Sequence, residues 1–300
     1  MDDLNFHLDA WRSLFPLSAV PVGERCGGRV NGLVVDPYSI CFVEQMREQA
    51  ALHDNLGTSV PTDVFIFAKG EPPRRDVTKI GGIPYRPAGK PWPSNSKGEP
   101  LTFVAQYCFS ESTDLVGALP GDVLLVFTSF GVHGRDRSEP LLHFEWYQLG
   151  LSDLGTLTET SSPAWKFSTC YGLRHRTVDY VEKCASEAIL RVIPDAVLRD
   201  EHPDEAVVNL CQIEGMKIGG MPFWPHPERI DSSALPGDFL CSLATIVISD
   251  NRPFPWANHN APITLSEAWA DESQLTWLSE SILNVSIDST SQLHWAIQLW

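Results

Sequence analysis

Alternating apolar and polar residues predict a series of strands along the chain. Residues 63–69 (DVFIFAK) and 100–109 (PLTFVAQYCF) follow a period of two, which is the spacing of side chains on the two faces of a strand. Further strands are predicted at 118–127, 141–149, 206–213, 234–249 and 293–300. Because several of these segments are joined by short polar links, antiparallel pairing is favoured.

A helical spacing of apolar residues predicts helices elsewhere. The chain opens with Leu4, Leu8, Trp11 and Phe15 on one helical face, and Pro16 ends this helix. Further helices are predicted at 39–55, at 177–194 and from Thr264 to about Asn284. Pro194 stops the third, and Thr264 with Glu267 forms a capping box at the start of the last.

One short pattern occurs twice, about half a chain apart. Lys-Ile-Gly-Gly, an apolar residue, Pro and an aromatic residue begin at Lys79 and again at Lys217. Ala-Leu-Pro-Gly-Asp also recurs, at 118 and at 234. Two repeats are too few for a solenoid, so they indicate two similar halves of one domain.

The combined pattern predicts an α+β fold, a duplicated, pseudo-symmetric arrangement of mostly antiparallel sheet with flanking helices. We expect one domain over 1–300, with halves at about 60–150 and 200–300 and a helical N-terminal segment over 1–56.

The repeated unit has the composition of a backbone turn. Paired glycines allow a positive φ or a close backbone approach, and the following Pro84 and Pro222 hold the residue before them extended. A phosphate-binding loop would instead need free amides at a helix start, and proline removes an amide and opposes a helix. We therefore interpret the unit as a structural turn.

The stretch from Lys79 to Phe109 resembles the YwqG-like family of bacterial domains of unknown function. The residues that carry the resemblance are Gly81, Gly82, Pro84, Trp92 and Gln106, with Gly219, Gly220 and Pro222 in the second unit. The later strand FLCSLATI departs from the family pattern, because it lacks a glutamine. The resemblance implies a duplicated α+β fold without established catalytic residues, and it implies an association of some members with bacterial toxin systems, as candidate immunity or antitoxin proteins.

The net charge of −16 narrows the classes of partner. Such a chain repels nucleic acid and anionic membranes and attracts basic proteins. Acidic surfaces are common, so the excess can serve solubility alone, or it can form a surface that meets a cationic protein. The acidic excess grows toward the C-terminus, where residues 230–300 hold eight acidic residues and one basic residue, Arg252. The start of the chain lacks a signal-peptide pattern, and the seven scattered cysteines contain no Cys-x-x-Cys pair, so we expect a cytoplasmic protein.

Few residues are spaced as catalytic or metal-binding groups would be. His143 and Glu145 share one face of a predicted strand, but a metal site needs a third ligand. The Arg174-His175-Arg176 cluster could bind an anion, although pairing with the surplus carboxylates is the simpler interpretation. We expect no catalytic residues, no metal and no cofactor.

Two hypotheses for the function follow. The first is an acidic binding protein that acts as an immunity or antitoxin protein, covering a basic toxin or effector. Its contact surface is predicted to include Asp250, Trp256, Glu267, Trp269, Asp271, Glu272 and Glu280. The second is a hydrolase or small-ligand-binding protein with a site in the cleft between the halves, using His143, Glu145 or Arg174.

Overall fold

A computed structural model describes about half of the chain. The described residues are 29–30, 33–34, 47–52, 55–69, 72, 74–129, 142–155, 170–181, 188, 191, 211–213, 215–224, 235–244, 257–258, 261–262 and 281–299.

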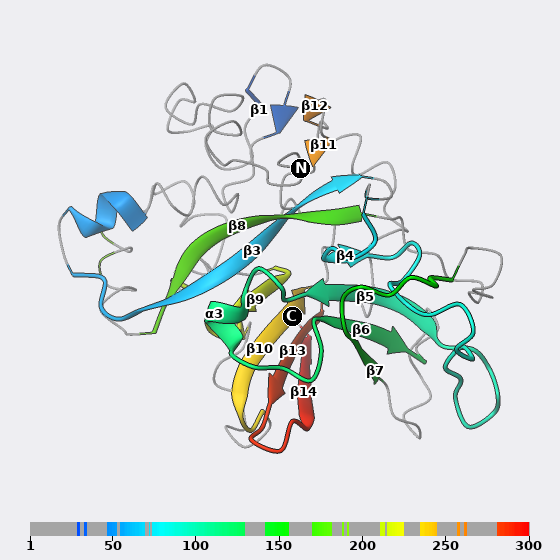
Figure 1. Ribbon diagram of the computed structural model, residues 1–300. Helices are drawn as coiled ribbons and strands as arrows, with labels where there is room; N and C mark the ends of the chain where they lie inside the picture. Colours follow the sequence, from blue (N-terminus) through cyan, green and yellow to red (C-terminus); the bar gives the residue numbers. More distant parts are fainter. Residues whose placement is uncertain are drawn as a thin grey trace.

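The described chain is mostly β-structure (Figure 1). Ten strands form the main sheet: β3 (Ser59–Lys69), β4 (Lys79–Ile80), β5 (Thr102–Cys108), β6 (Val123–Thr128), β7 (Leu142–Tyr147), β8 (Cys170–Tyr180), β9 (Lys217–Gly219), β10 (Asp238–Ala244), β13 (Ser281–Ile287) and β14 (Leu293–Leu299). Two small strand pairs lie outside it: β1 (Arg29–Val30) with β2 (Leu33–Val34), and β11 (Ala257–Asn258) with β12 (Ala261–Pro262). The helical segments of more than one described residue are 47–51 and α3 (Thr113–Val116).

The main sheet is antiparallel at every junction, in the order β14-β13-β10-β9-β3-β8-β4-β5-β6-β7. Its centre is the long pair β3–β8, joined along eleven residues from Ser59↔Tyr180 to Lys69↔Cys170. The sheet divides into two groups of strands that share β8: six strands from β14 to β8, and five strands from β8 to β7. In Figure 1 the two long strands cross above the two groups of shorter strands.

Both ends of the sheet contribute to one hydrophobic core. Val104, Leu124 and Val126 from β5 and β6 are buried in the same cluster as Leu240 and Val285 from β10 and β13. The Tyr107 side chain extends across this core, and its hydroxyl donates a hydrogen bond to the Ser242 carbonyl oxygen at 2.7 Å. The two groups of strands therefore pack against each other through their inner faces.

A second apolar cluster covers the outer face of β5 and β6. Phe103, Val123, Leu125 and Phe127 are buried there beneath Tyr85 and the partly buried Trp92. The segment between β4 and β5 thus forms a cover over one face of the sheet, and it begins at the first Gly-Gly turn.

The two Gly-Gly turns have similar, positive φ angles. The φ angles of Gly81 and Gly82 are 62° and 69°, and those of Gly219 and Gly220 are 69° and 74°. Each turn comes at the end of a short strand. The strand of the first turn, β4, pairs with β8 and β5, and the strand of the second turn, β9, pairs with β3 and β10. Side chains with a Cβ rarely adopt such angles, so glycine is required by the backbone here.

The antiparallel sheet is confirmed, as are strands within 63–69, 100–109, 118–127, 141–149, 234–249 and 293–300. The described residues are mostly β-structure with short helices, so the flanking helices of the expected α+β class are not shown in this part of the chain. The opening helix with Leu4 and most of 39–55 lie outside the described residues, although 47–51 is helical.

Three element predictions are wrong over part of the described chain. Residues 177–180 of the predicted helix 177–194 belong to β8, because they pair with residues 59–62 of β3, whereas Ala188 of the same prediction is helical and buried. Residues 281–284 of the predicted C-terminal helix belong to β13, where 282–284 are buried between two neighbouring strands. Residues 211–213 of the predicted strand 206–213 contain a helical residue and a bend. In each case tertiary contacts outweigh the local pattern.

The Gly220→Ala substitution tests whether the second turn requires both the backbone angle and the close contact. A Cβ at Gly220 would lie 2.4 Å from the Asp179 Oδ2 atom and 2.7 Å from the Thr62 Cβ atom. We expect Gly220→Ala to lower the free energy of unfolding by about 3 kcal/mol, measured by urea denaturation, because left-handed strain and a clash add.

Gly98→Ala is the matched control, since Gly98 has a φ of 78° and nothing within 4 Å of its Cβ position. It should cost only the left-handed strain, about 1 kcal/mol. Equal losses for the two variants would contradict close packing at Gly220.

Candidate functional site

The predicted partner-binding surface lies outside the described residues. This applies to all seven of its members: Asp250, Trp256, Glu267, Trp269, Asp271, Glu272 and Glu280. Within the described residues, charged side chains gather in three clusters, around Asp179, Asp63 and Glu145, in addition to the residues of the two turns.

Polar side chains within the sheet hold the first Gly-Gly turn closed. The buried Lys79 ammonium donates a hydrogen bond to the Ile83 carbonyl oxygen. Gln106, which pairs with Lys79 across β4 and β5, accepts a hydrogen bond from the Tyr85 amide at 2.9 Å. Its own amide donates to the carbonyl oxygens of Arg75 and Val77 at 2.7 and 2.6 Å. Gln106 thus fastens the chain on both sides of β4.

The second turn is held by a carboxylate instead of a glutamine. Ser242 pairs with Lys217 where Gln106 pairs with Lys79. The buried Asp179 of β8 accepts hydrogen bonds from the Lys217 ammonium at 2.7 Å, the Met221 amide at 2.9 Å and the Ile213 amide at 2.8 Å. The Asp179–Lys217 ion pair therefore stabilises the second turn, whereas the Gln106 amide stabilises the first.

The remaining motif residues also lie in internal contacts. The Trp92 indole donates a hydrogen bond to the Leu101 carbonyl oxygen at 2.7 Å, and its ring meets the edge of Phe127 at 5.3 Å between centroids. Pro84 is buried and Pro222 is half-buried, and each proline lies two residues after the second glycine of its turn. Trp92 and Pro84 thus belong to the cover over β5 and β6.

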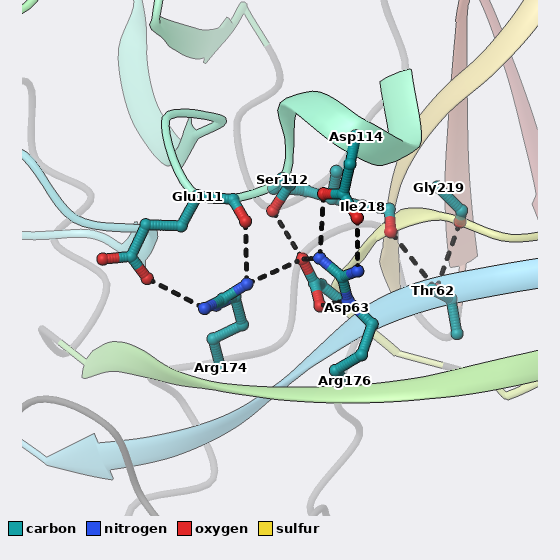
Figure 2. Close-up of polar contacts among 9 residues, drawn as sticks. All are labelled: Thr62, Asp63, Glu111, Ser112, Asp114, Arg174, Arg176, Ile218 and Gly219. Carbon is teal, nitrogen blue, oxygen red and sulfur yellow. Dashed lines mark hydrogen bonds and ion pairs between the residues drawn. The ribbon is translucent and has the colours of Figure 1, made fainter. Parts of the chain in front are cut away.

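The central charged cluster surrounds Asp63 of β3 (Figure 2). Asp63 is fully buried, and it accepts a hydrogen bond from the Ser112 hydroxyl at 2.6 Å. Arg176 of β8 donates to both carboxylate oxygens at 2.5 and 3.1 Å, and an Arg174 nitrogen lies 3.4 Å from the Oδ2 atom. A buried carboxylate is thus balanced by two arginines.

The same arginines fasten the segment around α3 to the central strands. Arg176 makes a second two-pronged contact with Asp114 at 2.6 and 3.1 Å, and Arg174 contacts both the backbone oxygen and the carboxylate of Glu111. Hydrogen bonds to Asp114 and Asp63 raise the pKa of Arg176 above its usual value, and the bond from Arg176 lowers the pKa of Asp114. The expected pairing of this basic cluster with carboxylates is confirmed.

This cluster joins the two groups of strands. The Thr62 hydroxyl, one residue before Asp63, reaches the carbonyl oxygens of Ile218 and Gly219 at 3.3 and 3.2 Å (Figure 2). A Cβ on Gly219 would lie 3.0 Å from the Leu115 Cβ atom of α3. The glycine of the second turn therefore lets α3 approach, which brings Asp114 within reach of Arg176.

The third cluster, the Glu145 cluster, lies on β7 and consists of Glu145, Arg86, Lys90, His143 and Tyr147. Buried Arg86 and Glu145 form two hydrogen bonds, at 2.7 and 3.2 Å. The Tyr147 hydroxyl donates to the carboxylate at 2.7 Å. Lys90 and His143 approach the Oε1 atom at 3.3 and 3.5 Å.

The environment of Glu145 keeps it ionised. Burial alone would raise its pKa, but hydrogen bonds from His143, Arg86 and Tyr147 outweigh burial and lower the pKa well below the usual range. Burial and the bond to Glu145 raise the pKa of Tyr147. A carboxylate held in this way is too weak a base for proton transfer near neutral pH, so it suits charge pairing better than general acid–base catalysis.

The sequence pointed to only part of these clusters. His143, Glu145 and Arg174 were singled out, whereas Asp63, Asp179 and Arg86 were not. A usable signal existed for Asp63, since a charged residue within the apolar strand pattern of 63–69 needs a buried partner. Among the described residues, no three potential ligands gather as a metal site, and no helix is long and apolar enough to cross a membrane.

Comparison with known proteins gives one partial match. Residues 78–137 match a family described as "Domain of unknown function (DUF1963)". The match begins next to Lys79 and includes the first Gly-Gly turn, Trp92, Gln106 and β6. No curated protein matches the chain.

The Asp63→Asn substitution tests the central cluster. It keeps the shape of the side chain but leaves Arg174 and Arg176 without their shared buried carboxylate. We expect a loss of about 2 kcal/mol in the free energy of unfolding, measured by urea denaturation. Asp114→Asn, at the exposed end of the same network, should cost much less. Similar losses for both variants would contradict the dominant role of Asp63.

Glu145→Gln tests the ionised state of the third cluster through pH. The pKa of Glu145 is lowered in the folded protein, so its stabilisation is complete above the unfolded value of about 4.3 and is lost as pH falls toward the folded pKa. The variant should be about 2 kcal/mol less stable than the wild type at pH 7, with a smaller difference below about pH 4.

Glu99→Gln is the control for the loss of one negative charge, because Glu99 is exposed and bonded to the Asn95 amide. Urea denaturation at several pH values gives both differences. A Glu145→Gln difference that stays constant from neutral to acidic pH would show that Glu145 is not stabilised as an anion.

Proposed function

We propose that this protein is an acidic, cytoplasmic immunity or antitoxin protein that neutralises a basic bacterial toxin or effector by direct binding. The observation that carries the proposal is the charge: −16 overall, with eight acidic residues and one basic residue over 230–300. A strongly acidic surface speeds association with a cationic protein and discriminates against other partners.

The described charged clusters support a binding role over a catalytic one. The carboxylate oxygens of Asp63, Asp179 and Glu145 accept hydrogen bonds from other side chains of the protein. The hydrolase alternative draws no support from Glu145, because the pKa of that side chain is far below the range suited to proton transfer. Arg174 is likewise engaged with Asp63 and Glu111.

We further infer that the chain is a YwqG-like protein of two units related by duplication. The two Gly-Gly turns have similar φ angles. Each turn follows a short strand whose lysine pairs with the neighbouring strand, Lys79 with β5 and Lys217 with β10. The register of that next strand shifts between Phe103 and Ala105 in β5 and between Phe239 and Cys241 in β10.

The central strands support the same inference. The Gly172 amide of β8 donates to the Thr78 carbonyl oxygen at 2.8 Å, and the Phe65 amide of β3 donates to the Met216 carbonyl oxygen at 3.1 Å. Thr78 and Met216 are the residues directly before the two repeated lysines. Corresponding residues of the two units thus form corresponding bonds.

The product of the adjacent open reading frame is the first partner to test. We expect it to form a complex with this protein at micromolar concentration, and we expect the affinity to fall as salt rises, because opposite surface charges are screened. Charge reversal at Glu267, Asp271 and Glu272 together should weaken binding at least tenfold in isothermal titration calorimetry.

Charge reversal at Asp3, Glu71 and Glu99 in the first half of the chain provides the matched control and should change the affinity less than threefold. Absence of a complex, together with no rescue of growth in cells that express the adjacent gene, would sink the proposal.

A further inference from the structure

The Glu145 cluster holds more positive charge than its internal contacts require. Arg86 and Glu145 balance each other through two hydrogen bonds, and both side chains are buried. Lys90 is therefore a surplus cation, placed 3.3 Å from the Glu145 Oε1 atom with 44% of its side chain exposed. The His143 side chain, 46% exposed, lies beside the same oxygen.

We propose that Lys90 and His143 form a binding site for a small oxyanion, a phosphate or carboxylate group, on the outer face of β7, with Tyr147 orienting the lysine. The Lys90 ammonium and the His143 ring approach one carboxylate oxygen, so they lie next to each other at the surface. The Lys90 Nζ atom also lies 4.8 Å from the centre of the Tyr147 ring, which fixes its direction.

The backbone that carries Lys90 is held in place before any ligand arrives. Arg86 donates hydrogen bonds to the carbonyl oxygens of Lys90 and Pro91, in addition to its two bonds with Glu145. The Arg86 guanidinium also lies over the Trp92 ring, 5.6 Å from its centre. Such preorganisation lowers the entropic cost of binding, because the lysine does not have to be ordered by the ligand.

The chemistry of the cluster favours an anion over a cation. Both oxygens of Glu145 already accept hydrogen bonds or contact cations, so the carboxylate has little capacity left for a positively charged ligand. Lys90 has N–H groups left, and its Nζ atom makes no other polar contact within the described part of the chain. Lysine and histidine donors at one surface point are typical ligands of phosphate and carboxylate oxygens.

The corresponding position of the second unit carries no charged residue. Glu145 pairs with Leu125, which pairs with Gln106 of the first unit. In the second unit, Ser242 corresponds to Gln106. Ser242 pairs with Asn284, and Asn284 pairs with Ala296, so Ala296 corresponds to Glu145. An uncharged residue thus occupies the equivalent position in β14, which is integrated into the sheet without a carboxylate there.

Titration of the full chain with inorganic phosphate, and separately with acetate, tests the proposal. Amide chemical shifts in NMR report the binding, and chloride keeps the ionic strength constant. We expect saturable changes in β7 and in residues 86–91 with at least one of the two anions. The anion that binds more tightly identifies the ligand class. No saturable change with either, or changes scattered over the whole surface, would overturn the site.

Variants locate the binding. Lys90→Met, which keeps the aliphatic stem, should weaken the affinity at least tenfold, and His143→Ala should weaken it at least threefold. Lys97→Met, at an exposed lysine in the turn before Glu99, is the control and should stay within twofold of the wild type. Equal weakening by Lys90→Met and Lys97→Met would overturn the proposal, and His143→Ala keeps the test decisive if Lys90→Met fails to fold.

Discussion

The pairing of β3 with β8 is the interaction on which the rest of the structure depends. These two strands pair along eleven residues, and each also carries a short strand on its other side, β9 on β3 and β4 on β8. The positions of both Gly-Gly turns therefore follow from one register. Every later strand adds outward from these turns, so an error at the centre would displace both ends of the sheet.

Buried charges specify that register. Asp63 lies opposite Arg176 and bonds to it, while Asp179 binds Lys217 from the neighbouring part of the sheet. A slip of one residue between β3 and β8 would put each carboxylate and its cation on opposite faces of the sheet and leave both unpaired. Buried ion pairs contribute little net stability compared with apolar packing, but breaking one is costly. Their value here is specificity: they exclude alternative pairings of the central strands.

Local patterns in the sequence predicted most strands because β5, β6 and β10 bury both faces and are strongly apolar. They did not predict β8, whose residues 174–176 read as a charged cluster and become strand-like only opposite Asp63. The turn of Gly81 and Gly82 was predictable, since the constraint is local. The Arg86–Glu145 pair was not, because its members are 59 residues apart and meet only when β7 joins the sheet. The net charge of −16, in contrast, follows from the composition alone.

Native-state amide hydrogen exchange tests the central claim, that the two groups of strands share one core built on β3 and β8. The slowest amides of β5 and β6 and those of β10 and β13 should exchange with the same opening free energy and the same dependence on urea, equal to those of global unfolding. If β10 and β13 opened at a lower free energy while β5 and β6 stayed protected, the halves would unfold separately, which would contradict a shared core.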